Sequence, residues 1–415
     1  MANFNHLGKA ATLTLMGAMG VALPFNAMAA ESIEAALKDS KTKLSLRPRY
    51  ESVEVTDDTA EAFTLKTRLT FTTGSFYDTS AVLEFDDVTS LKSVDYNDGT
   101  NGITGPAIVD PEGTEVNQAY LSYKGLDSTD FKWGRQRILL DNQRFVGGVG
   151  WRQNEQTYGA FSVGNASVEN LSLFYAHISN VNRIFGEQSP AGRHSHDTNL
   201  FNVNYKFDGI GSLSGYYYDI ENEDAVGLSN ATYGLRFSGA TSFDSFKLGY
   251  ELEYADQEES GDAPEYSADY MLIGVSGTMA GFTLGIAQET LGADTDVGKG
   301  FTTSLATLHK FQGWADKFLA TPGTGVEDTY ITFKAGLPWG MKFIAVYHDF
   351  ESAENVAAGT SSDFGSEIDA AITKKFKNGA SLQLKYADFS GEEDSANGGS
   401  QTDVTKIWVT ATYAI

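Results

Sequence analysis

Four arginines lie close together in one short stretch of the sequence, Gly134–Thr157, and arginine is a residue type suited to binding anions. The stretch reads GRQRILLDNQRFVGGVGWRQNEQT and contains Arg135, Arg137, Arg144 and Arg152. A guanidinium group can form two parallel hydrogen bonds with a carboxylate or a phosphate. The cluster therefore predicts either a place where anionic solutes bind or a set of ion pairs that stiffens the structure.

The charge of the whole chain contrasts with this basic cluster. The protein has 30 Lys and Arg residues against 55 Asp and Glu residues, a formal net charge of −25, so no nucleic-acid partner is expected. Acidic residues gather at 95–112, 258–262 and 392–394, and they could bridge divalent cations to lipopolysaccharide. None of these segments has the spacing of a cation-binding loop. Solvation of surface loops is therefore the preferred interpretation of the acidic segments.

Signals for an enzyme are missing from the sequence. No G-x-S-x-G, H-E-x-x-H or phosphate-binding glycine motif is present. His194 and His196 could hold a metal weakly, but a metal site needs three or four ligands and no third is apparent. The sequence thus predicts a protein without catalytic residues, cofactor or metal.

The first 29 residues have the layout of a secretory signal peptide. Lys9 precedes an apolar run from Ala10 to Leu23, and Ala27-Met28-Ala29 supplies a small-x-small cleavage site. The run is short for a membrane anchor, which needs about 20 residues. We expect residues 1–29 to be removed and residues 30–415 to form one domain. The chain has no cysteine, so neither disulfides nor thiolate metal sites are expected.

Hydrophobic residues alternate with polar ones along most of the chain. In SFKLGYELEYA, Phe246, Leu248 and Tyr250 fall on one face while Lys247 and Glu251 fall on the other. This period of two predicts strands with one apolar and one polar face. The pattern is compatible with a soluble or adhesive β-protein, whose apolar face is inside, and with a membrane barrel, whose apolar face meets lipid.

Loop lengths favour the membrane barrel. The alternation predicts strands at 43–55, 62–72, 80–88, 116–124, 130–138, 154–163, 171–179, 198–206, 212–221, 230–239, 245–255, 266–276, 282–290, 328–336, 342–350, 366–375, 381–389 and 403–415. Tight turns follow the even strands, and long polar loops follow most odd strands. Short periplasmic turns, long external loops and an even strand number are typical of bacterial outer-membrane proteins. The predicted fold is therefore all-β, a transmembrane antiparallel barrel of about eighteen strands in the outer membrane.

A barrel of this size encloses water, and its polar face lines the interior. Rings of basic residues in such a lumen favour anions. The predicted lining residues on the strands include Arg47, Arg49, Arg68 and Arg236, with acidic neighbours such as Glu51, Glu84, Glu251 and Glu253. These charges could select solutes, or they could pair with one another within the wall.

The arginine-bearing stretch loses the period of two after Gly134 and regains it in the sixth strand. It contains apolar residues such as Ile138, Leu140 and Phe145, which an exposed loop would not need. We therefore expect this loop to fold into the barrel, with its glycine cluster allowing the bend. Its polar side chains should then form a constriction, and they are Asp141, Asn142, Gln143, Arg144, Arg152 and Gln153.

The stretch GRQRILLDNQRFVGGVGWRQNEQTY, together with LATLHKFQGWADKFLATPGTGVEDTY at Leu305–Tyr330, resembles the alginate-export-type family of outer-membrane porins. The resemblance implies an eighteen-stranded barrel with a basic pore for sugars or sugar acids. Carried over by position, it places Arg135, Gln136, Arg144, Arg152 and Gln153 along the pore. Arg137, in the same stretch, is also expected to line the constriction. It also implies a second inward loop, with His309, Lys310, Trp314, Asp316 and Lys317 near the mouth.

The predicted function is passive diffusion of small hydrophilic solutes, with a preference for anionic sugars or organic acids. The alternative is export of an alginate-like polysaccharide, although no periplasmic turn is long enough to serve as a gate. Expected partners are outer-membrane lipid, lipopolysaccharide and the barrel-assembly machinery. The chain ends in Ile415, where such barrels usually end in an aromatic residue, so its assembly signal departs from the usual form.

Overall fold

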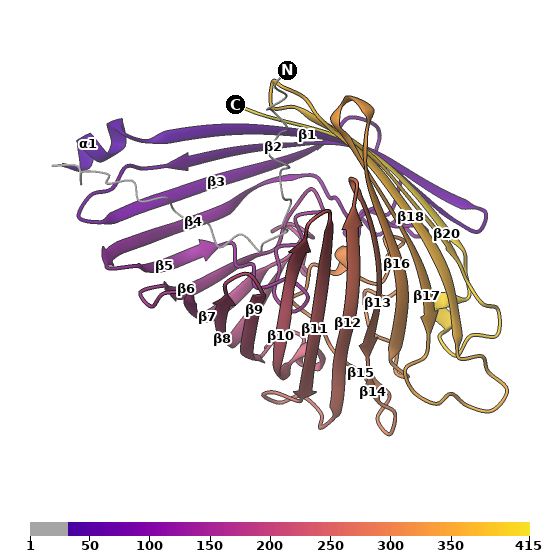
Figure 1. Cartoon of the computed structure of the whole chain (residues 1–415). Helices are drawn as coiled ribbons and strands as arrows, with labels where there is room; N and C mark the ends of the chain where they lie inside the picture. Colours follow the sequence, from indigo (N-terminus) through magenta and orange to yellow (C-terminus); the bar gives the residue numbers. More distant parts are fainter. Residues whose placement is uncertain (1–31) are drawn as a thin grey trace, which may run out of the picture.

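The computed structural model describes residues 32–415, which form one closed antiparallel barrel of eighteen strands (Figure 1). Each strand pairs with its neighbours in sequence, and every predicted strand overlaps an observed one. The predicted signal peptide lies outside the described residues. The barrel strands are β1 (Lys41–Val55), β2 (Asp58–Thr72), β3 (Thr79–Ser90), β4 (Gly113–Leu126), β5 (Thr129–Gln136), β6 (Thr157–Asn165), β7 (Leu171–Asn182), β8 (Arg193–Phe207), β9 (Gly211–Ile220), β10 (Asn230–Phe243), β11 (Phe246–Glu258), β12 (Ser267–Met279), β13 (Phe282–Leu291), β16 (Val326–Leu337), β17 (Met341–Glu351), β18 (Asp363–Lys375), β19 (Ser381–Ser390) and β20 (Val404–Ala414).

The barrel closes where β20 pairs with β1, and Figure 1 shows these two strands side by side, in yellow and indigo. Although Ile415 is not aromatic, its backbone exchanges two hydrogen bonds of 2.9 Å with Leu44, which extends the closing ladder. Pro48 lies inside β1 and has no N–H to donate. The β1–β20 ladder is interrupted at Arg47 and Pro48, so the missing donor falls where no partner is required.

The two ends of the barrel differ in the same way as the predicted loops. Short turns at 73–78, 127–128, 166–170, 208–210, 244–245, 280–281, 338–340 and 376–380 lie at one end, together with helix α1 (Ile33–Lys38). The Ser32 side chain caps this helix, and Gly74 donates its N–H to the Ala36 carbonyl at 2.9 Å. Most longer loops lie at the other end, which identifies it as the external end.

The outward face of the wall is apolar and the inward face is polar, which decides between the two architectures that the sequence left open. On β13, Phe282, Leu284 and Ile286 point to one face of the strand and are exposed. Ala287 and Glu289 point to the other face and are buried. A soluble sandwich would bury the first set in a core. An exposed apolar band is instead the surface that a transmembrane barrel presents to lipid. No helix in residues 32–415 is long and apolar enough to cross a membrane.

Two loops enter the interior and pack against each other. The first, 137–156, connects β5 to β6, and the second, 292–325, connects β13 to β16 and includes the small hairpin of β14 (Ala293–Asp294) and β15 (Lys299–Gly300). Ile138, Leu140, Val146 and Leu305 are buried. The predicted inward fold of both loops is thus confirmed. We call them the first and second inner loops.

Candidate solute channel

The two inner loops are held together by main-chain contacts. Val146 and Leu305 form a parallel bridge, and the Gly147 N–H donates to the Leu305 carbonyl at 2.8 Å. A Cβ added at Gly147 would lie 2.2 Å from the Thr307 hydroxyl oxygen, so a larger residue would force the loops apart. From the wall, the Tyr158 hydroxyl donates to the Gly147 carbonyl at 2.6 Å. The glycine cluster therefore serves this close approach between loops.

Arg144 fixes the first inner loop to the wall at β13 and does not face open space. Its side chain is 1% exposed, its Nε lies 2.9 Å from the Glu289 carboxylate, and it donates to the Gln312 side-chain oxygen at 2.9 Å. The guanidinium also lies 4.7 Å from the centre of the Phe311 ring. The prediction that Arg144 lines a constriction is therefore corrected. The buried Glu289 carboxylate on the wall neutralises the charge of Arg144.

Arg152 anchors the other side of the same loop, at β1. It donates to the Glu51 carboxylate at 3.1 Å, and its guanidinium lies 3.9 Å from Asp110 and 3.7 Å from Asp316. Burial alone would lower the pKa of Arg152, but these three carboxylates outweigh it and raise the pKa. Arg49 is similarly buried, with its guanidinium 4.3 Å from the Trp151 ring centre. Arg49 and Arg152 thus neutralise buried acids and do not line the channel.

Asp110 and Gln153 complete this buried cluster. The Gln153 N–H donates to Asp110 Oδ1 at 2.7 Å, and its side-chain amide donates to the Thr64 hydroxyl at 2.8 Å. Gln153 has no exposed surface, which corrects its predicted place in the constriction. Asp110 is 1% exposed, so its interpretation as a solvated loop residue was also wrong. The loop at 91–112 therefore reaches inward as well.

Asp141 ties the first inner loop to the wall at β8 and β9. Its carboxylate accepts hydrogen bonds from the Ser214 hydroxyl at 2.5 Å and from the Asn202 side chain at 2.7 Å. The residue is partly exposed and has a positive φ of 47°. Its backbone turns the loop at this point, while both carboxylate oxygens are occupied by the wall.

Open basic groups remain where strands β1 to β4 meet the start of the first inner loop: Arg68 lies on β2, and Arg137 is the first residue of that loop. We call this surface the β1–β4 wall. The side chain of Arg137 is 28% exposed and that of Arg68 is 19% exposed. Their carboxylate partners are nearly covered: Glu84 and Glu155 are each 5% exposed and Asp86 is 2% exposed. Because strand β2 turns Leu69 and Phe63 outward, the exposed surface of Arg68 faces the lumen. A solute passing this wall meets guanidinium groups in front and carboxylates behind.

Close pairing holds these guanidiniums in place. Arg68 forms a two-point contact with Asp86, at 2.7 and 2.6 Å, and also donates to Glu155 at 2.8 Å. Arg137 donates from Nε to both oxygens of Glu155, at 3.1 and 3.2 Å. Burial alone would raise the pKa of Glu155, but Arg137 and Arg68 lower it to about 2. Glu155 is thus ionised near neutral pH and fixes both arginines.

Arg47 contributes to the same wall but is committed to the first inner loop. It donates to the Gln153 side-chain oxygen at 2.8 Å and to the Gly150 carbonyl at 2.9 Å, and it also bonds the Arg152 carbonyl. The side chain is half-buried. Arg47 therefore supports the first inner loop.

On the opposite wall, at β10 and β11, the arginine is covered and a carboxylate is exposed. Arg236 is 9% exposed and donates to Glu253 and Glu251 at 2.5 and 2.8 Å, whereas the Glu251 carboxylate is 37% exposed. Lys310 of the second inner loop is exposed beside this wall, and it donates to the Asn142 carbonyl at 2.6 Å. The predicted interior position of Arg236 agrees with these contacts, but Glu251 is the group that faces solvent here.

Arg135 and Gln136 do not lie where the resemblance implied. Arg135 shares the outward parity of Trp133 on β5 and lies beside Gly159 of β6 on the outer face. Gln136 points inward but is 2% exposed, and its side chain accepts a 2.7 Å hydrogen bond from Ser162. The equal parity of Trp133 and Arg135 in the sequence is a signal that could have placed Arg135 outside.

Sequence reasoning missed an aromatic cage around Lys385 on β19. The Lys385 Nζ lies 3.6 Å from the Trp314 ring centre, 4.0 Å from that of Trp151 and 5.3 Å from that of Trp408. It also lies 2.7 Å from His309 Nε2, whose other ring nitrogen is 2.7 Å from Asp316. Burial lowers the pKa of His309 to about 3, against the opposing effect of Asp316. His309 is therefore a neutral, buried bridge and does not lie at the mouth.

Among solved structures, the barrel is similar to several proteins of Pseudomonas aeruginosa. OccK5 (OpdH) matches with a TM-score of 0.70 at 14% identity, over 92% of this chain and 99% of that one. OpdK, solved with vanillate, matches with a TM-score of 0.70 at 16% identity, over 91% and 99% of the two chains. OccK2 (OpdF), solved with glucuronate, matches with a TM-score of 0.68 at 13% identity, over 91% and 98%.

These similarities show a shared fold, a closed antiparallel β-barrel of eighteen strands. No protein-family model matches the sequence, and no curated protein matches it. The narrower assignment to the alginate-export-type family therefore finds no support in these comparisons.

Proposed function

We propose that this protein is an outer-membrane porin through which small anionic solutes diffuse passively. One observation carries the proposal: on the β1–β4 wall, Arg68 and Arg137 are exposed to the lumen while their carboxylate partners are covered. An anion that approaches this wall reaches the guanidiniums before it meets the acids behind them. Fixed guanidiniums bind carboxylates and phosphates without first having to be ordered.

Small carboxylates are the solute class that fits this wall. A carboxylate can accept two parallel hydrogen bonds from one guanidinium, and Arg137 keeps the larger exposed surface for such a contact. Vanillate and glucuronate, which accompany two of the similar structures, are both small organic acids. They support the proposal as chemical analogues of the expected solutes.

Polysaccharide export is the less favoured alternative because of how the inner loops are anchored. The first inner loop bonds β1 through Arg152 and β13 through Arg144, and the second bonds β18 through the Trp314 N–H, which donates to Glu367 at 2.5 Å. A wide polymer path would require these buried ion pairs to break. Small solutes need no such rearrangement.

The test is ion selectivity in planar bilayers. We expect the purified full chain to show a reversal potential of anion-selective sign in a KCl gradient, and to admit glucuronate into liposomes faster than a neutral sugar of equal size. A cation-selective channel would overturn the proposal. The signal peptide at 1–29 and the predicted contact with the barrel-assembly machinery remain separate predictions.

A further inference from the structure

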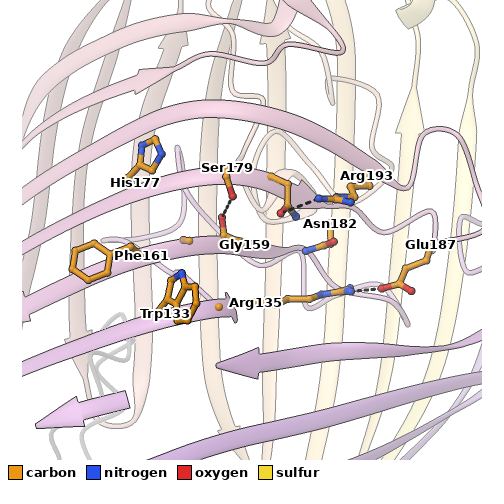
Figure 2. Close-up of a pocket in the computed structure, with 12 residues that line it drawn as sticks. Trp133, Arg135, Gly159, Phe161, His177, Ser179, Asn182, Glu187 and Arg193 are labelled. Carbon is orange, nitrogen blue, oxygen red and sulfur yellow. Dashed lines mark hydrogen bonds and ion pairs between the residues drawn. The ribbon is translucent and has the colours of Figure 1, made fainter. Parts of the chain in front are cut away.

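A pocket lined by both charged and aromatic residues interrupts the apolar outer face of the barrel between β5 and β8. Its volume is about 730 Å³, and Figure 2 shows its lining, which includes Trp133, Arg135, Phe161, Glu187 and Arg193. Elsewhere on the outer face, exposed positions such as those of β13 carry large apolar side chains. A hollow that contains two arginines is therefore a local departure from the lipid-facing surface.

The pocket lies outside the wall and does not open into the lumen. The strand ladders continue beneath it, because Arg135 pairs with Gly159 and Gly159 pairs with Asn180. Gly159 leaves room for the Asn180 side chain in the hollow, because a Cβ there would lie 2.2 Å from Asn180 Oδ1. Register shifts at Gly159/Ala160 and Ile178/Asn180 bend the wall at the same place. The hollow is thus built from the backbone and is independent of the solute path.

The pocket sits at the external ends of its strands and changes polarity with depth. Arg135 is next to the last residue of β5, and Arg193 is the first residue of β8, both at the end that bears the long loops. Trp133, which is 69% exposed, and Phe161 lie one step further toward the periplasmic end. Charged groups at the external end and aromatic rings on the periplasmic side of them match the headgroup region and the acyl region of the outer leaflet, respectively.

The two arginines differ in the partners they already have. Arg135 donates to Thr157 at 3.0 Å, bonds Glu187, and lies 3.5 Å from Glu115. Arg193 donates to Asn180 Oδ1 at 3.4 Å and forms no ion pair with any carboxylate in residues 32–415. Its guanidinium is exposed and lines the pocket. One positive charge at headgroup depth is therefore available for an anion.

We propose that this pocket binds the phosphorylated glucosamine headgroup of lipopolysaccharide, with Arg193 on a phosphate and with Trp133 and Phe161 against the first acyl carbons. Three features favour this occupant: the external depth, the gradient from polar to aromatic, and the uncommitted positive charge. A soluble anion would gain nothing from the two exposed rings. A guanidinium and a phosphate form charge-assisted hydrogen bonds of good geometry.

The test is native mass spectrometry of the full barrel in detergent micelles that contain bis-phosphorylated lipid A, with dephosphorylated lipid A as the comparison probe. We expect the phosphorylated lipid to bind, and binding to weaken about tenfold in Arg193→Ala. Ser179→Phe, which fills the pocket without changing charge, should weaken it as well. Lys92→Ala is the matched control, because Lys92 is an exposed external cation that pairs with Glu61 of β2 and does not line the pocket.

Equal binding of the two lipids, or unchanged binding in both Arg193→Ala and Ser179→Phe, would overturn the proposal. Folding of each variant is checked by heat-modifiable gel mobility, and channel conductance should stay at the wild-type value because the pocket is outside the wall. The proposal on lipid binding and the proposal on solute selectivity can therefore be refuted independently of each other.

Discussion

The substitution Arg137→Gln tests whether exposed guanidiniums set the selectivity of the channel. Arg137 has the more exposed side chain of the two lumenal arginines on the β1–β4 wall. Glutamine keeps a donor at similar reach but removes the charge. Glu155 would keep Arg68 as a partner at 2.8 Å, so the first inner loop should remain attached.

The size of the effect follows from Coulomb's law. A monovalent anion that passes about 5 Å from the guanidinium gains about 0.8 kcal/mol in a water-like dielectric. The carboxylates behind Arg137 are present in both the wild type and the variant, so they do not change this difference. A cation is disfavoured by the same amount. The difference between anion and cation therefore changes by about 1.6 kcal/mol, and the anion-to-cation permeability ratio should fall by up to about fifteenfold.

The assay is the reversal potential of single channels in a KCl gradient at low ionic strength, where screening is weak. Arg193→Gln is the matched control, since it removes an arginine from the outer face. A wild-type ratio in a folded Arg137→Gln channel would show that solutes do not pass this wall. Equal losses in both variants would indicate a long-range effect of net charge and would also refute the local reasoning.

Three further changes should separate selectivity from loop anchoring. Arg144→Met leaves Glu289 buried without its cation, so we expect the free energy of unfolding to fall by about 3–5 kcal/mol in urea titrations, with Glu289→Gln recovering part of the loss. Burial raises the pKa of Glu155, but the guanidiniums of Arg137 and Arg68 lower it more, to about 2. The stabilising charge of Glu155 is therefore complete above about pH 4.3 and is lost as the pH falls toward 2. Anion preference should rise as the pH falls through this range, and it should rise less in Glu155→Gln. Lys385→Met removes the bond to His309 and should increase current fluctuations as the second inner loop loosens, whereas a quiet channel would contradict this role.

The strands could be predicted from the sequence because each wall residue faces only one of two environments. Lipid outside and water inside impose a strict period of two, so the parity of a residue such as Phe282 or Glu289 is enough to place it. The largest boundary error is the start of β8, predicted at Thr198 and observed at Arg193. The start of β6 is wrong in the other direction, predicted at Asn154 and observed at Thr157. Residues 154–156 are polar like a strand's inner face, yet they belong to the first inner loop.

The roles of individual arginines could not be predicted in the same way. Arg144 and Arg137 lie in the same loop and have the same side chain. Arg144 is nevertheless buried in an ion pair with Glu289, which is far away in the sequence, whereas Arg137 stays partly exposed. Asp110 likewise lies in a polar loop and still becomes a buried partner of Arg152. Which cations remain exposed depends on loop packing across the barrel, and no local period records such packing.

The contrast between an acidic chain and the anion-selective path that we propose can be explained by side-chain length. Arginine is long enough to pair through one side of its guanidinium and still present the other to water, whereas Asp86 and Glu84 end close to the backbone and are covered by their partners. A wall with nearly balanced charges can therefore show a basic surface. Arg236 shows the limit of this effect: Glu253 and Glu251 both contact it, it is covered, and Glu251 faces the lumen instead. In the proposed channel, solute preference thus depends on which member of each ion pair is exposed to the lumen, and the net charge of the protein does not determine it.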